Sequence, residues 1–253
     1  MAASFPDGLE TAGYFDGLSV ESICKRFGGT VALDHLSLRV GRGEIVGLFG
    51  RDGAGKTVCF EAIMGLTAID SGRMSLFGHD ITGLTIDRRA PLGLTYLPQA
   101  TSIFGGMTTS QNISCVLEHT ETDRGERERR LQELLDTFDI DYVRNVPAPR
   151  LSGGERRRCE VARAMASSPA IMLLDEPFAG IDPMSIASIK GTIVKLRSMD
   201  VGILMSDQNV RETISIVDRA YVIHHGELIF HGKPDEMMAD RDVHRYYLGE
   251  EKL

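Results

Sequence analysis

The segment Gly50–Thr57 has the residue types and spacing to hold a phosphate group. It fits the pattern GxxxxGK(S/T), and it stands between a predicted strand and a predicted helix over Lys56–Met64. Glycines let bare backbone wrap a β-phosphate with its N–H groups, at a helix start that already favours anions. Lys56 would supply a charge to the β- and γ-phosphates, and the Thr57 hydroxyl would complete a Mg²⁺ shell. The alternative is a Gly-rich turn that binds nothing, and such a turn would not need to lie between a strand and a helix.

An acidic pair follows a second apolar run. Asp175 and Glu176 come directly after Ala170–Leu174. At the end of a buried strand, Asp175 would lie beside the metal ion. Glu176 would lie one step further, where it could orient or deprotonate a water that attacks the γ-phosphate. The alternative is a capped helix start before Pro177, which needs no ligand.

The run Leu151–Glu155 predicts a second anion site. Ser152 and Glu155 have the spacing of a capping box, which explains both residues without a ligand. It does not explain Gly153 and Gly154, because a glycine in the first helical turn costs about 0.5–1 kcal/mol relative to alanine. A bare helix start attracts anions. The sequence therefore predicts a γ-phosphate gripped between two surfaces.

The elements that must position these residues predict an α/β fold with a parallel sheet. Continuous apolar runs predict strands buried on both faces at Glu44–Phe49, Ala170–Leu174 and Val201–Met205. Leu36–Val40 alternates apolar and polar residues, which predicts a strand with one face in solvent. Tyr221–Phe230 is typical of a hairpin, and Pro234 would begin a short terminal helix.

Residues near 101–168 predict a second, mostly helical lobe. One helix face is marked by apolar residues at i, i+3, i+4 and i+7, namely Leu131, Leu134, Leu135 and Phe138. The lobe interrupts the sheet-based core, which comes from the two ends of the chain. The length of 253 residues is ample for such a core and insert.

Composition excludes several classes of protein. A net charge of −8 argues against a surface that coats nucleic acid, since such binding depends on neutralising phosphates. No run of about 20 apolar residues predicts a membrane span, and residues 1–17 do not have the pattern of a signal peptide. The four cysteines are far apart, which indicates free thiols in a reducing compartment. The run Ala90–Leu117 carries no charge.

Together these motifs resemble the ATP-binding cassette (ABC) ATPases over about residues 18–249. Further strings of the resemblance are Gln99 after Tyr96-Leu97-Pro98 and the loop Ala179–Asp182. The resemblance implies a P-loop NTPase fold: a RecA-like parallel sheet core, an antiparallel β subdomain and a helical subdomain inserted at about 101–168. It also implies one nucleotide-binding domain over 18–253, preceded by an N-terminal extension of residues 1–17.

The resemblance implies ATP and Mg²⁺ as cofactors and a homodimer with two shared sites. In this family two chains pair head to tail, so Ser152 and Gly154 of one chain would contact ATP held by the other. The implied nucleotide-binding residues are Phe27, Gly50, Arg51, Asp52, Gly53, Ala54, Gly55, Lys56, Thr57, Val58, Ser152, Gly153, Gly154, Glu155 and Asp182. The implied catalytic residues are Glu176, Gln208 and Gln99, and the implied metal ligands are Thr57, Gln99 and Asp175.

The same resemblance implies integral membrane partners that dock near Gln99–Phe104, with the uncharged run lining the groove because an unpaired charge at an interface is costly. It places the chain at the cytoplasmic face of the inner membrane. Finer strings, among them Ser102-Ile103-Phe104 and Tyr247-Leu248-Gly249-Glu250, are similar to those of the lipopolysaccharide export type. The run Leu151–Glu155 is similar to the signature sequence of this family, and Arg156–Arg158 lie on the helix that it begins, the signature helix. They would make ion pairs or brace this interface rather than bind nucleic acid.

Two departures from the family stand out. Gln208 stands where the family has a histidine that contacts the γ-phosphate, and Arg51-Asp52 replaces the usual Pro-Asn. Gln can donate to a phosphate but cannot exchange a proton near neutral pH, so the rate of hydrolysis is expected to be reduced. The alternatives are a branched-chain amino-acid-type importer ATPase and a slow or degenerate ATP-binding switch. Phe27 would stack on adenine, with a core residue as the alternative.

Overall fold

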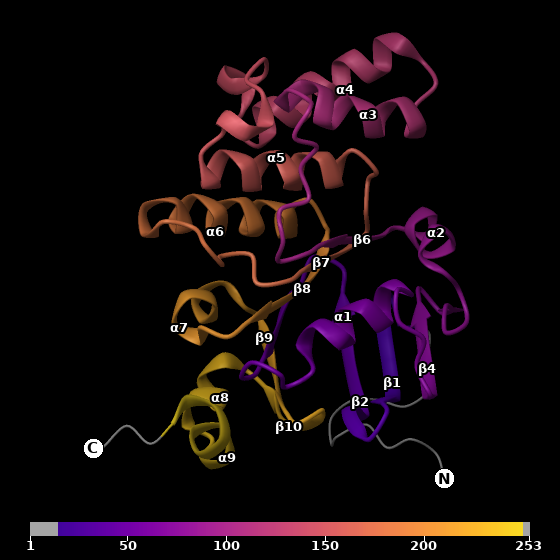
Figure 1. Ribbon diagram of the computed structural model, residues 1–253, viewed down its shortest axis with the longest axis vertical. Helices are drawn as coiled ribbons and strands as arrows, with labels where there is room; N and C mark the ends of the chain where they lie inside the picture. Colours follow the sequence, from indigo (N-terminus) through magenta and orange to yellow (C-terminus); the bar gives the residue numbers. More distant parts are fainter. Residues whose placement is uncertain (1–14, 250–253) are drawn as a thin grey trace.

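The computed structural model describes residues 15–249, which form two sheets and a helical lobe (Figure 1). The antiparallel sheet has the order β2-β1-β4-β5, and its strands are β1 Gly17–Phe27, β2 Thr30–Gly41, β4 Ser71–Leu76 and β5 His79–Asp80. The larger sheet has the order β10-β9-β3-β8-β7-β6. Its strands are β3 Ile45–Phe49, β6 Leu94–Leu97, β7 Ile171–Leu174, β8 Gly202–Asp207, β9 Arg219–His224 and β10 Glu227–Gly232.

Strands β6, β7, β8, β3 and β9 of the larger sheet run parallel, and β10 pairs with β9 in the antiparallel direction. The predicted parallel sheet, buried strands and terminal hairpin are therefore confirmed. Parallel strands bring their carboxyl ends to one edge of a sheet, where ligands bind in open α/β folds. The phosphate loop follows β3, Gln99 follows β6, Asp175 follows β7 and Gln208 follows β8, so this edge gathers the predicted site.

The helices surround the sheets and build the upper lobe in Figure 1. In chain order they are α1 Lys56–Met64, α2 Ile86–Arg89, α3 Thr109–Thr120, α4 Arg124–Thr137, α5 Gly153–Met165, α6 Pro183–Ser198, α7 Val210–Thr213, α8 Pro234–Ala239 and α9 Arg241–Val243. Helices α3, α4 and α5 fall within the stretch predicted to be helical. The predicted face of α4 is buried at Leu134, Leu135 and the C-cap Phe138. None of the helices in the described part of the chain is long and apolar enough to cross a bilayer.

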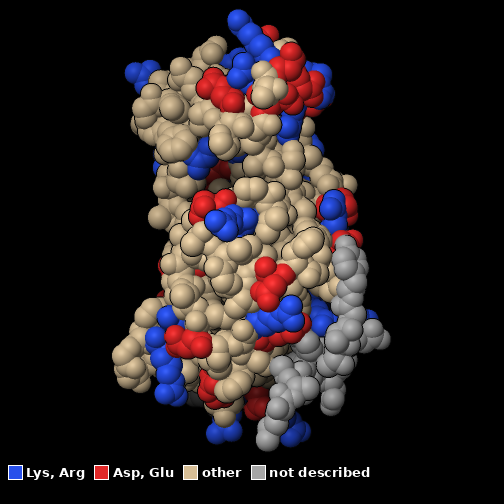
Figure 2. Space-filling model, turned by 90° about the vertical axis from the view of Figure 1, so that its right-hand side faces the viewer, with Lys and Arg blue, Asp and Glu red and all other residues tan. Residues whose placement is uncertain are grey.

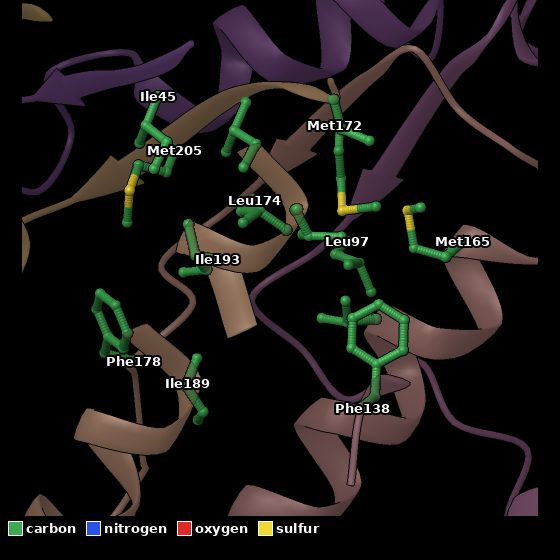
Figure 3. Close-up of a cluster of buried hydrophobic side chains, with 14 of the residues drawn as sticks. Ile45, Leu97, Phe138, Met165, Met172, Leu174, Phe178, Ile189, Ile193 and Met205 are labelled. Carbon is green, nitrogen blue, oxygen red and sulfur yellow. The ribbon is translucent and has the colours of Figure 1, made fainter. Parts of the chain in front are cut away.

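One hydrophobic cluster joins the sheet to the helical lobe (Figure 3). The side chain of Leu174 in β7 lies next to Ile193 of α6, and Met172 of the same strand lies next to Met165 of the helical lobe. A second cluster lies between the antiparallel sheet, α1 and the other face of the larger sheet. The larger sheet is thus covered on both faces, which fixes the positions of its strand ends.

The prediction that Leu36–Val40 exposes one face is wrong. Ser37 and Arg39 are buried together with their apolar neighbours, because β2 is covered on both sides. The Ser37 hydroxyl accepts a hydrogen bond from the Ser22 backbone N–H at 2.9 Å. The Arg39 guanidinium donates to Ser19 Oγ at 3.4 Å. Polar side chains can be buried when they are hydrogen-bonded, so the alternation of apolar and polar residues alone did not predict solvent exposure.

The limits of the predicted domain remain a prediction. Strand β1 begins at Gly17, and most of the predicted extension, residues 1–14, lies outside the described residues, as does Glu250.

The prediction of free thiols is confirmed at all four cysteines. Cys59 is a fully buried residue of α1, the helix that follows the phosphate loop, and burial raises the pKa of its thiol.

Candidate functional site

The phosphate loop closes around its own lysine. Lys56 Nζ donates to the carbonyl oxygens of Gly50 at 2.7 Å and Arg51 at 3.1 Å, and the residue is 5% exposed. The loop leaves no room for side chains at two glycines. A Cβ at Gly50 would lie 2.5 Å from the Ile223 carbonyl oxygen, and one at Gly55, whose φ is 111°, would lie 2.5 Å from the Ala32 carbonyl oxygen. The glycine spacing is therefore a packing requirement as well as a phosphate-binding one.

A pocket of about 430 Å³ opens beside this loop. Its lining residues are Asp52, Gly53, Gly55, Lys56, Thr57, Val58, Gln99, Glu176 and Gln208. The structure thus brings together all three predicted catalytic residues, from the ends of three different strands, with most of the loop. Arg51 and Ala54 line a smaller neighbouring cavity with His224 and His225 instead.

Asp175 lies beneath this pocket and is 2% exposed. Its carboxylate accepts hydrogen bonds from the Tyr96 hydroxyl, at 3.1 Å, and from the Ser206 hydroxyl. The Ser206 hydroxyl also accepts from the Glu176 backbone N–H at 3.0 Å. These partners satisfy a buried anion that would otherwise be costly. Sequence analysis missed Tyr96 and Ser206; the one available signal was a polar side chain near the carboxyl end of each strand.

Glu176 occupies the floor of the pocket, with its side chain held by two predicted site residues. Gln99 Nε2 donates to Glu176 Oε2 at 2.8 Å, and Lys56 Nζ lies 3.9 Å from Oε1. Burial raises the pKa of the Glu176 carboxyl, as do the charges of Asp175 and Asp52, against the opposing effect of Lys56. A raised pKa makes the carboxylate a better proton acceptor.

The backbone at Glu176 rules out the helix start that was the alternative for the acidic pair. Its φ of 42° is left-handed, and residues 176–179 form turns. The next helix, α6, begins at Pro183, after the N-cap Asp182. A left-handed non-glycine residue costs free energy, and such residues concentrate at functional sites.

Asp207 is a further buried carboxyl next to the pocket, and it was not predicted. It ends β8, is 5% exposed, and accepts a hydrogen bond from the Asn209 backbone N–H at 2.7 Å. Burial raises the pKa of Asp207 to about 6, and the charge of Glu176 acts in the same direction. Its oxygen Oδ2 is buried without a hydrogen-bond partner.

The signature turn, residues 151–155 at the start of α5, has its polar side chains hydrogen-bonded to one another within one chain. The Glu155 carboxylate accepts from the Ser152 backbone N–H at 2.8 Å and from the Ser152 hydroxyl at 2.7 Å. Both side chains are accessible, whereas Gly154 is buried and Gly153 lines a cavity of about 200 Å³ with Gln99 and Glu176. The capping box is therefore formed, and Ser152 and Glu155 do not line the phosphate pocket of their own chain.

Two other predicted nucleotide contacts also lie outside the pocket lining. Asp182 caps α6 by accepting from the Ser185 backbone N–H at 3.0 Å. Hydrogen bonding from the Ser185 side chain, and then from its backbone N–H, lowers the pKa of the Asp182 carboxyl. Phe27 is 50% exposed at the end of β1, with Lys25 Nζ 5.1 Å from its ring centre. The alternative that Phe27 is a core residue is therefore wrong. Stacking on a base requires an exposed ring of this kind.

The uncharged run packs against the charged signature helix. Phe104 is 50% exposed, its backbone N–H donates to Asn112 Oδ1 at 2.8 Å, and the Arg163 guanidinium lies 4.7 Å from its ring centre. The predicted ion pair of the arginine cluster forms at Arg157, which is buried 3.2 Å from Glu160. Figure 2 shows basic and acidic side chains intermixed on the face that it presents.

The donor set fits Mg²⁺. This ion prefers hard oxygen ligands and is commonly held by one or two protein groups together with phosphate oxygens. Thr57 and Gln99 line the pocket, with a hydroxyl and an amide oxygen as donors, and Asp175 supplies a buried negative charge beneath them. Cys24, Asp34 and His35 also converge, within 4.8 Å of one another, but hydrogen bonds among them account for that cluster.

Comparisons with known proteins agree with this geometry. A family model described as ABC transporter matches residues 33–179. A probable ABC transporter ATP-binding protein of Azorhizobium caulinodans is 50% identical over 92% of this chain and 83% of its own length. The lipopolysaccharide export system ATP-binding protein LptB of Escherichia coli is 43% identical over 92% of this chain and 98% of its own length.

Solved structures share the fold. The ADP conformation of an ATP-binding cassette of an ABC transporter matches with a TM-score of 0.83 at 24% identity, over 92% of this chain and 99% of that one. The cbiO1 protein of Clostridium perfringens, part of the ABC transporter complex cbiONQ, matches with a TM-score of 0.83 at 25% identity, over 91% of this chain and 94% of that one. Fold and pocket together define an ATP-binding cassette. The chain belongs to the ABC transporter family, as an ATP-binding subunit.

Proposed function

We propose that this chain hydrolyses ATP as a head-to-tail homodimer and drives integral membrane partners that export a lipopolysaccharide-type lipid. The observation that carries the proposal is the convergence of Lys56, Gln99 and Glu176 on one pocket beside the phosphate loop. A charge for the phosphates, a polar group for Mg²⁺ and a proton acceptor are the parts that hydrolysis of a γ-phosphate needs.

Each residue of the pocket has a distinct role in this proposal. Backbone N–H groups of the loop and Lys56 bind the phosphates. Thr57 and Gln99 would hold Mg²⁺, which would supply positive charge to the phosphates. Glu176, whose raised pKa favours proton uptake, accepts the proton of the attacking water. Gln208 donates its amide N–H to the γ-phosphate.

The position of the signature turn supports the dimer. Ser152 is accessible at a helix start, where N–H groups favour an anion, yet it does not line the pocket of its own chain. A second copy can bring this turn to the γ-phosphate of the first. Phe104, half exposed on the uncharged run, is the proposed contact with the membrane partners, at the cytoplasmic face of the inner membrane. The cargo is inferred from 43% identity to LptB.

The test is phosphate release from the purified chain, with and without co-purified membrane partners. We expect turnover that Glu176→Gln abolishes and that Gln208→His raises severalfold, because a histidine can also carry a positive charge to the phosphate. ATP binding without any phosphate release, alone or with partners, would contradict the proposal. That result would favour the alternative of an ATP-binding switch, which the presence of Gln208 suggests.

A further inference from the structure

The side chain of Gln208 lies against a carboxylate of the phosphate loop. One terminal atom of the Gln208 amide lies 2.9 Å from Asp52 Oδ1 and 3.2 Å from Asp52 Oδ2, and it is assigned as the nitrogen. This is the orientation in which the amide donates, since the opposite one would place the amide oxygen against two acceptors. Both residues line the phosphate pocket. The contact therefore joins the loop after β3 to the turn after β8.

The backbone of this turn has its own supports. The Gln208 carbonyl oxygen accepts from the Tyr247 hydroxyl at 3.0 Å, and the Asn209 N–H donates to Asp207. The ring of Tyr247 stacks with Phe49 at the end of β3. These contacts place the main chain of Gln208 next to the pocket, and Asp52 then fixes the direction of the amide.

We propose that Asp52 is a positioning residue that keeps the Gln208 amide facing the γ-phosphate of bound ATP. This inference rests on the proposed function. An amide NH₂ group has two hydrogens, so one can remain on Asp52 while the other reaches a phosphate oxygen. A hydrogen bond to an ionised acceptor is about twice as strong as one between neutral groups. Asp52 and Gln208 both differ from the residues usual in the family. They thus act as one unit, in which the Asp52 carboxylate orients the neutral Gln208 amide.

Asp52 has two opposing effects on nucleotide binding, and they can be separated. Its negative charge lies beside the phosphates, so its removal tightens the binding of ATP and ADP alike. Its hold on Gln208 affects the γ-phosphate, which ADP lacks. The ratio of ATP affinity to ADP affinity therefore reports the positioning role and cancels most of the charge effect.

The experiment measures this affinity ratio in the Glu176→Gln background, where ATP is not consumed. The variants are Asp52→Ala, Asp52→Asn, Gln208→Ala and the double variant of Asp52→Ala with Gln208→Ala. Each single change to alanine is expected to lower the ratio about tenfold, the range of one charge-assisted hydrogen bond. The double variant is expected to match Gln208→Ala within about twofold, because the two residues act in series. Asp52→Asn keeps an acceptor oxygen and is expected to lose less than about threefold.

Two results would overturn the inference. In one, the losses of the two single variants multiply in the double variant, which means that the residues act independently. In the other, Asp52→Ala leaves the ratio unchanged or raises it, which means that Asp52 holds Gln208 away from the phosphate. Thermal unfolding of each variant shows whether it is folded. If Asp52→Ala does not fold, the isosteric Asp52→Asn can still be measured. A failure of the proposed function appears separately, as absent phosphate release from the unmutated chain.

Discussion

The phosphate loop and the signature turn are both helix starts rich in glycine, but only one of them has a complete site in a single chain. At the loop, the buried Lys56, together with Gln99 and Glu176, lines a pocket of about 430 Å³. At the turn, Ser152 and Glu155 satisfy each other and face outward. The difference indicates that the loop is preorganised for a ligand within one chain, whereas the proposed function gives the turn a ligand only in a second copy.

The strongest test of this comparison is a substitution in the pocket beside the phosphate loop. Glu176→Gln removes the proposed proton acceptor but keeps an oxygen for Gln99, so turnover is expected to fall about 1000-fold. The affinity for ATP is expected to change by less than about threefold, because the loop and Lys56 are untouched. Phosphate release and equilibrium ATP binding measure the two quantities. A residual rate within tenfold of the original would exclude Glu176 as the base.

A substitution in the helical lobe can separate contacts with the membrane partners from contacts with the nucleotide. Phe104→Ala removes a half-exposed aromatic ring and is expected to weaken retention of the membrane subunits about 30-fold, as aromatic anchors commonly do. ATP binding is expected to persist. Co-purification measures retention, with Met199→Ala, a similarly exposed apolar side chain at the C-cap of α6, as the matched control. Equal retention of the partners by both variants would move the docking surface elsewhere.

The signature turn itself can be tested against an ordinary helix cap. Ser152→Ala and Asp123→Ala each remove an N-cap in the same lobe, which costs about 1 kcal/mol of stability. Only Ser152→Ala is expected to lower turnover, about tenfold, because only Ser152 is proposed to contact nucleotide across a dimer. Unfolding midpoints and phosphate release are measured side by side. If the two variants lose activity equally, the role of Ser152 is capping alone.

The smallest expected effect concerns Asp207. Its pKa is raised to about 6 by burial, from 3.8, so the folded chain holds this proton to a higher pH than the unfolded chain does. The free energy of unfolding therefore falls between about pH 4 and pH 6 and stays lower above pH 6. Asp207→Asn keeps an oxygen for Asn209 and is expected to raise the free energy of unfolding at pH 8 by on the order of 1 kcal/mol. Little change is expected at pH 4, and an equal gain at both pH values would contradict this account.

Sequence patterns predicted the parts of the molecule that depend on local order. The phosphate loop, the buried strands β3, β7 and β8, and the capping box at Ser152 all follow from spacing and periodicity. The edge that collects the site also follows, because parallel strands end on the same side.

The remainder depends on contacts between distant segments. Ser206 supports Asp175 across neighbouring strands, Tyr247 holds Gln208 from the far end of the chain, and Asp52 meets Gln208 across two loops. Burial of Ser37 and Arg39 likewise depends on what covers β2. No local period encodes such pairs, so a buried polar residue could be noticed in the sequence but its partner could not be named.

The central claim is that ATP is held between the loop of one chain and the signature turn of a second copy. The direct test is the molar mass of the Glu176→Gln variant in solution, measured by sedimentation with saturating Mg²⁺ and ATP and again with ADP. The account predicts a dimer with ATP that returns to monomer with ADP, and loss of the ATP dimer when Ser152→Ala is added. A variant that binds ATP and remains monomeric at every concentration would contradict it.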